Sequence, residues 1–187
     1  MTSALPDPAQ NPAATFLAFL LASVAALAGV FVFQFGVGLI PCELCLWQRL
    51  PHALAILLAG VAAGQARAAQ RMIFPDRAMP WGTLSAIAAL LALDHLAGAG
   101  LAAFHIGVEQ HWWAGTEACT GAAPAGLSVE ELRARLLDTP PARCDQVAWS
   151  LFGISLAGFN FLLSVALSAA AAWSFLRLRR RSAERRP

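Results

Sequence analysis

Four long apolar stretches constrain what this chain of 187 residues can fold into. Each stretch is close to or longer than the ~20 residues that a helix needs to cross the hydrocarbon core of a bilayer. A helix satisfies its own backbone hydrogen bonds in lipid, whereas an open sheet does not, so the stretches predict helices. The sequence therefore predicts an all-α membrane protein, a four-helix transmembrane bundle, with spans at about 14–40, 46–64, 81–107 and 147–176.

The composition excludes several other classes of protein. Hydrophobic residues make up 58% of the chain and charged residues 13%, whereas an average soluble domain has roughly 25% charged residues. The formal net charge of +2 is too small to indicate a nucleic-acid partner. We expect the first stretch to be a retained helix, because residues 1–13 contain no basic residue and the apolar run is longer than that of a signal peptide.

The arginines predict which side of the membrane each loop faces. The chain contains no lysine, so all 13 basic residues are arginines. Three of them lie in the loop at about 65–80 and six in the basic tail, residues 177–187. Cytoplasmic segments are enriched in basic residues, so we expect this loop, the tail and a flexible N-terminal segment, residues 1–13, in the cytoplasm. The two outer loops, at about 40–46 and 108–146, then face the periplasm.

The second outer loop contains one predicted helix. Ser128 and Glu131 have the spacing of a capping box. Val129, Leu132 and Leu136 fall on one helical face. The pattern predicts a short amphipathic helix, either lying on the membrane surface or packed on the bundle as an ordinary loop helix.

All four cysteines fall in the two outer loops, Cys42 and Cys45 in the first and Cys119 and Cys144 in the second. An oxidising compartment such as the periplasm lets disulfides persist. The Cys-x-x-Cys spacing lets two sulfurs bond and also lets one sulfur act as a thiolate. Cys45 is predicted near a helix N-terminus, where the helix dipole favours negative charge, and Arg49 follows one turn later on the same face.

Three other uses of the cysteines fit the sequence less well than redox chemistry. A four-cysteine zinc site is disfavoured by the long separation of Cys119 from Cys144 and by the positive charge of Arg49. A c-type haem needs a histidine directly after the second cysteine, where this chain has Leu46. Two structural disulfides remain an alternative, although a first loop this short between two membrane helices has little need of a stabilising disulfide. We therefore predict redox-active cysteines and no metal.

The side chains that follow Cys45 indicate where its electrons go. Cys45, Arg49 and His52 form one stripe that runs from the outer surface into the membrane. A lipid-soluble acceptor would meet this stripe, and a basic residue there stabilises negative charge as it develops. The sequence contains no flavin or nicotinamide fingerprint. A quinone, ubiquinone or menaquinone, is the predicted acceptor, with His105 near the outer interface as a further neighbour.

Asp94 and His95 lie deep in the third stretch. Ionisable residues at that depth are costly and indicate a functional site by default. One interpretation is a proton relay for quinone reduction, and the other is a hydrogen-bonded contact between helices.

The segments around the cysteines resemble the disulfide bond formation protein B (DsbB) family. The resemblance extends over about residues 15–176, and it implies a four-span membrane domain, residues 14–176, in the bacterial inner membrane. It rests on residues 41–49 (PCELCLWQR), 104–113 (FHIGVEQHWW), 143–145 (RCD) and 151–155 (LFGIS).

The resemblance implies an activity and a role for each cysteine. Members of the family are quinone-dependent thiol oxidases that reoxidise a periplasmic thioredoxin-fold dithiol oxidase (DsbA-like). The implied disulfides are Cys42–Cys45 and Cys119–Cys144. The partner's thiolate attacks Cys119, the freed Cys144 attacks Cys42, and Cys45 passes the electrons to quinone. Arg49 corresponds to the quinone-side arginine of the family.

Two alternatives and one departure from the family pattern stay open. A vitamin K epoxide reductase-like quinone reductase also has four helices and two cysteine pairs, but there the Cys-x-x-Cys pair comes late in the chain. A non-enzymatic membrane protein with structural disulfides is the second alternative. Glu43 stands between the first two cysteines, where the family more usually has an uncharged residue, and it leaves the redox potential of this pair open.

Overall fold

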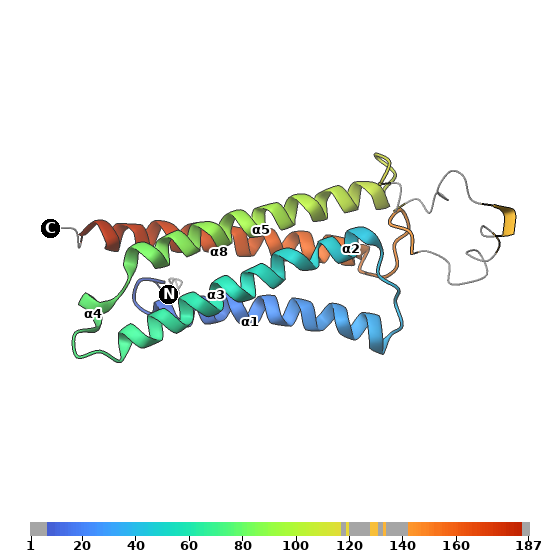
Figure 1. The fold of residues 1–187 in the computed structure, drawn as a ribbon. Helices are drawn as coiled ribbons and strands as arrows, with labels where there is room; N and C mark the ends of the chain where they lie inside the picture. The colour runs from blue at the N-terminus through green and yellow to red at the C-terminus, as the bar shows by residue number, and fades with distance from the viewer. Residues whose placement is uncertain (1–6, 117–118, 120–127, 131–132, 134–141, 185–187) are drawn as a thin grey trace.

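The computed structural model describes residues 7–116, 119, 128–130, 133 and 142–184. Within this part of the chain, four helical segments are long and apolar enough to cross a membrane, and they run side by side (Figure 1). This arrangement confirms the predicted all-α membrane bundle. The segments are Pro12–Gly36, Glu43–Gln70, Trp81–Glu109 and Leu156–Glu184.

The first span consists of α1 (Pro12–Phe31) and a π-helical turn, η1 (Val32–Gly36). Asn11 caps α1, since its side chain accepts a hydrogen bond from the amide of Ala14. The span ends before the predicted residue 40. Gly38 has a φ of 81°, a backbone conformation that favours glycine and turns the chain away from the helix axis.

The second span is divided into α2 (Glu43–Trp47) and α3 (Arg49–Gln70). Cys42 caps α2, because its Sγ accepts a hydrogen bond from the amide of Cys45 at 3.2 Å. The helices therefore begin before the predicted residue 46 and extend beyond residue 64. The loop predicted at 65–80 is correspondingly shorter and contains one turn of helix, α4 (Pro75–Ala78).

The third span, α5 (Trp81–Glu109), agrees with its prediction, but the fourth, α8 (Leu156–Glu184), begins well after the predicted residue 147. The apolar residues before it include a short hairpin, in which β1 (Ser150–Leu151) pairs antiparallel with β2 (Ile154–Ser155). The turn between these strands has positive φ values, 52° at Phe152 and 77° at Gly153, which no helix contains.

The bundle is built from two helix pairs, α5 with α8 and α1 with α3, and α3 also packs on α5. Among the described residues, α1 and α8 hardly touch each other. Small side chains on α3 let its neighbours approach closely. The alanines of α3 that are buried in this way are Ala55, Ala59, Ala62, Ala63, Ala66 and Ala69.

The segment before α1 packs against the end of α8, at the opposite end of the bundle from the cysteines (Figure 1). Asp7 forms an ion pair with Arg177 at 2.7 Å. Residues 7–13 of the segment predicted to be flexible are thus held in place, and α8 continues to Glu184 through the first part of the predicted tail. The predicted amphipathic helix that begins near Ser128 falls largely on residues outside the described ranges.

Candidate active site

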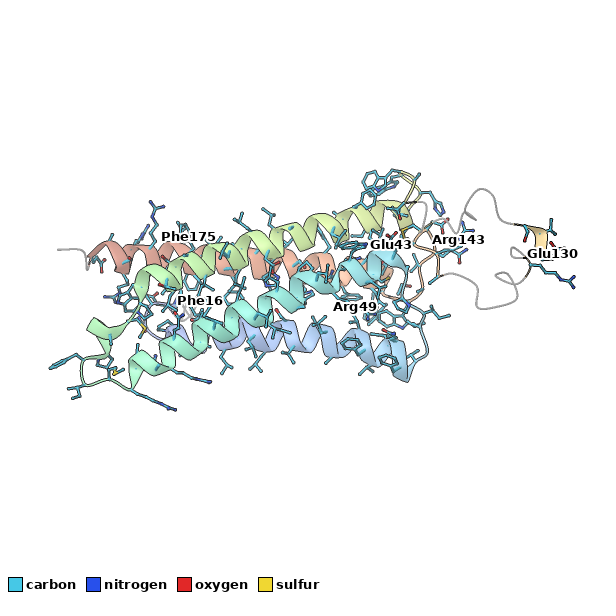
Figure 2. All side chains as sticks on the ribbon, viewed as in Figure 1. Phe16, Glu43, Arg49, Glu130, Arg143 and Phe175 are labelled. Carbon is cyan, nitrogen blue, oxygen red and sulfur yellow. A yellow bond between two sulfur atoms is a disulfide. The ribbon has the colours of Figure 1, made fainter. Side chains whose placement is uncertain are left out.

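A cavity of about 270 Å³ lies in the bundle at the cysteine end. Its walls come from α1, α3, α5, α8 and the loops beside them. Figure 2 shows Arg49 near this end of the bundle, inward of Glu43 at the start of α2 and of Arg143 in the loop before α8. The structure thus brings together five residues predicted as site residues, since the cavity is lined by Cys42, Cys45, Arg49, His52 and His105.

Cys42 and Cys45 are present as two unbonded thiols with their Sγ atoms 2.7 Å apart. A disulfide between them therefore stays a prediction. Cys45 lies in the first turn of α2, near the helix N-terminus as predicted, and its backbone amide donates a hydrogen bond to Cys42 Sγ. Cys42 is also the more buried of the two. Its hydrogen bond with Cys45 and its burial raise the pKa of the Cys42 thiol above the ordinary value.

Cys119 and Cys144 are joined by a disulfide, and both are fully buried. They belong to one buried cluster with Cys42, Leu44 and Val108. The two cysteine pairs, far apart in the sequence, are therefore packed together at the rim of the bundle.

Charged and hydroxyl groups surround the second pair. Arg143 donates two hydrogen bonds to Asp145, on either side of Cys144. These hydrogen bonds hold the pKa of the Asp145 carboxyl below its usual range. The hydroxyl of Thr116 donates to Glu43, so α2 is tied to the segment that leads to Cys119.

A line of polar side chains runs from Cys42 into the membrane. His105 Nε2 lies 3.6 Å from Cys42 Sγ, and His105 Nδ1 lies 2.6 Å from Gln48 Nε2. Asn160 Nδ2 donates to Gln48 Oε1 at 2.7 Å, and Asn160 Oδ1 lies 2.8 Å from His52 Nε2. The sequence reasoning did not assign Gln48 or Asn160 to the site. The signal for both is a polar amide within a membrane span.

Arg49 is placed to bind a ligand in the cavity. Its guanidinium lies over the ring of Phe31, 5.2 Å from the centroid, which holds the side chain against α1. Its Nε is buried and has no hydrogen-bond partner among the described residues. A buried charged donor without a partner is costly, so an acceptor in the cavity would relieve this cost.

Asp94 and His95 do not line the cavity. The His95 ring is buried with its centroid 5.8 Å from that of His52, and neither of its nitrogens has a partner among the described residues. Asp94 Oδ2 also lacks one there. A relay through this pair stays a prediction.

Three side chains of the site have the donor atoms of a metal site. The ligand atoms of Cys42, Cys45 and His105 all lie within 4.8 Å of one another. Thiolate and imidazole ligands suit soft metals such as zinc. The predicted absence of a metal therefore stays a prediction.

A family profile and individual relatives of the chain point to the same protein family. Residues 12–174 match the profile of the family described as disulfide bond formation protein DsbB. The chain is 30% identical over 175 residues to the disulfide bond formation protein B of Xanthomonas axonopodis pv. citri, covering 90% of this chain and 93% of the relative. It is 34% identical over 145 residues to the protein of that name from Verminephrobacter eiseniae, covering 76% and 73% of the two chains.

A third relative is an uncharacterized protein of Rickettsia prowazekii, which is 24% identical over 153 residues, covering 81% of this chain and 80% of the relative. No solved structure gave a significant match to the chain.

Proposed function

Because this chain belongs to the disulfide bond formation protein B family, we propose that it is a membrane thiol:quinone oxidoreductase. It reoxidises a periplasmic thioredoxin-fold dithiol oxidase and passes the electrons to ubiquinone or menaquinone in the bacterial inner membrane. This activity supports disulfide formation in exported proteins. The observation that carries the proposal is the cavity lined by both Cys45 and Arg49, beside two packed cysteine pairs.

The cysteine end of the bundle faces the periplasm and both termini face the cytoplasm. Two observations support this orientation. Arg67 and Arg71 lie near the end of α3, and Arg177–Arg181 near the end of α8, both at the end away from the cysteines (Figure 1). Basic residues at one end of a bundle favour its retention on the cytoplasmic side.

Electrons enter through two successive thiol–disulfide exchanges. The partner's thiolate attacks Cys119 Sγ, the Cys119–Cys144 bond breaks, and Cys144 leaves as a thiolate. Cys144 then attacks Cys42 Sγ, the proposed Cys42–Cys45 bond breaks, and the electron pair stays on Cys45. The partner's second thiol displaces Cys119, and Cys119 re-forms its bond to Cys144, so that Cys42 leaves as a thiolate. Cys42 bonds again to Cys45 as the electron pair passes to the acceptor. The burial of Cys42, Cys119 and Cys144 in one cluster supports this sequence, because each attack needs contact between sulfurs.

The residues that line the cavity fit a quinone. When bound, a quinone supplies an acceptor for two electrons and two protons. Arg49, whose side chain lines the cavity, would bind a ring oxygen through its guanidinium. His105 and His52 add ring nitrogens to the same wall. The aromatic rings of Phe33 and Trp149, with centroids 4.8 Å apart, also line the cavity.

The test uses the purified full-length protein in nanodiscs that contain ubiquinone or menaquinone, mixed with a reduced thioredoxin-fold dithiol oxidase. We expect one quinone to be consumed for each dithiol oxidised, and the Cys45→Ser variant to consume none. Oxidation of the partner without loss of quinone would contradict the proposal, as would persistence of both disulfides after the partner is added. Mass analysis of lipids that copurify identifies the natural quinone.

The order of attack needs a separate experiment. A single-cysteine partner variant should be trapped as a mixed disulfide by the unaltered chain but not by Cys119→Ala. Trapping by the Cys119→Ala variant would show that the partner attacks another cysteine.

A further inference from the structure

Gln48 of the second span and Asn160 of α8 connect two histidines across the bundle. Gln48, His52 and His105 are at most 7% exposed, so their polar groups must find partners inside the protein. The Gln48 and Asn160 amides bond to each other and each contacts one histidine, Gln48 at His105 and Asn160 at His52. The result is one continuous hydrogen-bonded line through α3, α5 and α8.

The direction of this line is fixed at one end by the backbone. Gln48 Nε2 donates to the carbonyl of Leu44 at 3.3 Å, and a carbonyl oxygen only accepts hydrogen bonds. The amide of Gln48 therefore keeps its nitrogen toward Leu44 and its oxygen toward Asn160. Asn160 then donates through Nδ2 and presents its Oδ1 to His52.

This direction dictates which nitrogen of each histidine carries the proton. Gln48 Nε2 is a donor, so His105 Nδ1 must accept, and the ring proton lies on Nε2, 3.6 Å from Cys42 Sγ. The main chain of Cys144 also interacts with the His105 ring. Asn160 Oδ1 is an acceptor, so His52 carries its proton on Nε2 and leaves Nδ1 as an acceptor without a partner among the described residues.

We propose that Gln48 and Asn160 are positioning residues that fix the tautomers of His105 and His52, so that His105 always presents an N–H to the Cys42 sulfur. The proposal rests on the proposed function. When Cys119 displaces Cys42 from Cys144, Cys42 leaves as a thiolate that the N–H of His105 stabilises, whereas the opposite tautomer would present a lone pair to it.

The line positions the histidines and does not conduct protons through the amides. A carboxamide accepts at oxygen and donates at nitrogen, and a transfer along it would require an unfavourable amide tautomer. Side-chain partners that set a histidine tautomer are common at sites where the imidazole acts on another group. Protons for the reaction therefore reach the histidines from the cavity side.

The tautomers are measured by nitrogen NMR of the full-length protein, labelled at its 4 histidines and assigned by replacing one histidine at a time. We expect His105 and His52 each to carry the proton on Nε2 in the unaltered protein. In Gln48→Glu an acceptor replaces the donor that faces His105, so Nδ1 of His105 should gain a proton. A proton on Nδ1 of His105 in the unaltered protein, or no change at that nitrogen in Gln48→Glu, would overturn the proposal.

Asn160→Leu tests the second histidine and the effect on turnover. The His52 signal should lose its fixed Nε2 proton, and kcat for dithiol oxidation should fall roughly fivefold, the effect of one hydrogen bond. The matched control is Ser168→Ala, which removes a hydrogen bond from α8 to the carbonyl of Ala92 on α5 but does not touch the line. Equal losses of kcat in the two variants, with unchanged histidine signals, would show that Asn160 only packs the helices.

This test is separable from the proposed function. The tautomer measurement requires no quinone and no partner, so it stands if the protein proves to have another electron acceptor. Failure of the proposed function would appear as intact tautomers without quinone consumption.

Discussion

Glu43 Oε2 lies 3.9 Å from Cys119 Sγ, so the residue between the first two cysteines contacts the second pair. The contact joins the start of α2 to the point where the partner's thiolate is proposed to attack. The contact therefore puts the charge of Glu43 beside the second pair as well as between the first two cysteines.

We predict that Glu43→Gln makes the reduced Cys119 more reactive. A carboxylate beside a sulfur disfavours the thiolate, and its removal should speed alkylation of reduced Cys119 by about three- to tenfold at pH 7. The rate is measured by mass spectrometry of alkylated peptides. Glu130→Gln is the control, because Glu130 is exposed and lies far out from the bundle (Figure 2). An equal change in both variants would contradict a local effect of Glu43.

Arg49→His should weaken the use of quinone more than the exchange between cysteines. Loss of a buried charged donor typically costs about 1.5–3 kcal/mol, so KM for quinone should rise roughly tenfold or more. Steady-state assays at several quinone concentrations measure this value. Arg71→His, at the exposed far end of the same helix, should leave KM unchanged. An unchanged KM in Arg49→His would remove Arg49 from the binding site.

The reduced first pair should react with alkylating reagents at Cys45 before Cys42. The neighbouring sulfur and burial raise the pKa of Cys42, so its thiol stays protonated at neutral pH. Cys45 is also the more exposed of the two. Brief treatment at pH 7 followed by peptide mapping should find the label on Cys45, and a preference for Cys42 would show that the accessible thiolate is the other sulfur.

Asp7→Asn should destabilise the bundle modestly at neutral pH. Hydrogen bonds from Arg177 lower the pKa of Asp7 below 3.8, so the stabilisation is fully present above that value and is lost as the pH falls through the lower folded-state pKa. The ion pair is partly exposed, and we expect a loss of about 0.5–1 kcal/mol at pH 7.

Thermal unfolding in detergent measures this loss. Glu184→Gln is its control, because the ion pair of Glu184 with Arg181 is longer, 3.9 Å, and more exposed. A Glu184→Gln effect as large as that of Asp7→Asn would indicate a general response to charge at this end of the bundle.

The spans could be predicted from the sequence because hydrophobic length is a local property. The start of the fourth span could not be predicted in this way. Trp149, Leu151 and Phe152, which precede α8, are as apolar as the residues of a membrane-spanning helix. What divides them from α8 is the turn at Phe152 and Gly153, where positive φ values interrupt the helix. Apolarity alone does not distinguish a hairpin at the membrane rim from a helical turn.

The site was predictable in part for a similar reason. Cys45, Arg49 and His52 lie close together in the second span, in α2 and the start of α3, and their spacing placed them on a common face. The contact of Gln48 with Asn160 depends on how α3 and α8 are aligned, and one sequence does not contain that alignment. The direction of the hydrogen bonds to the histidines depends further on a backbone carbonyl, that of Leu44.

The scarcity of contacts between α1 and α8 has a consequence for exchange of the electron acceptor. The helix packed most closely against α1 is α3, so a shift of the α1 wall at the cysteine end would leave α5 and α8 together. If the acceptor is the proposed quinone, we expect its reduced form to leave sideways into the lipid at this wall. If this departure limits turnover, the turnover rate should rise with the fluidity of the surrounding bilayer and should not change with the viscosity of the aqueous medium.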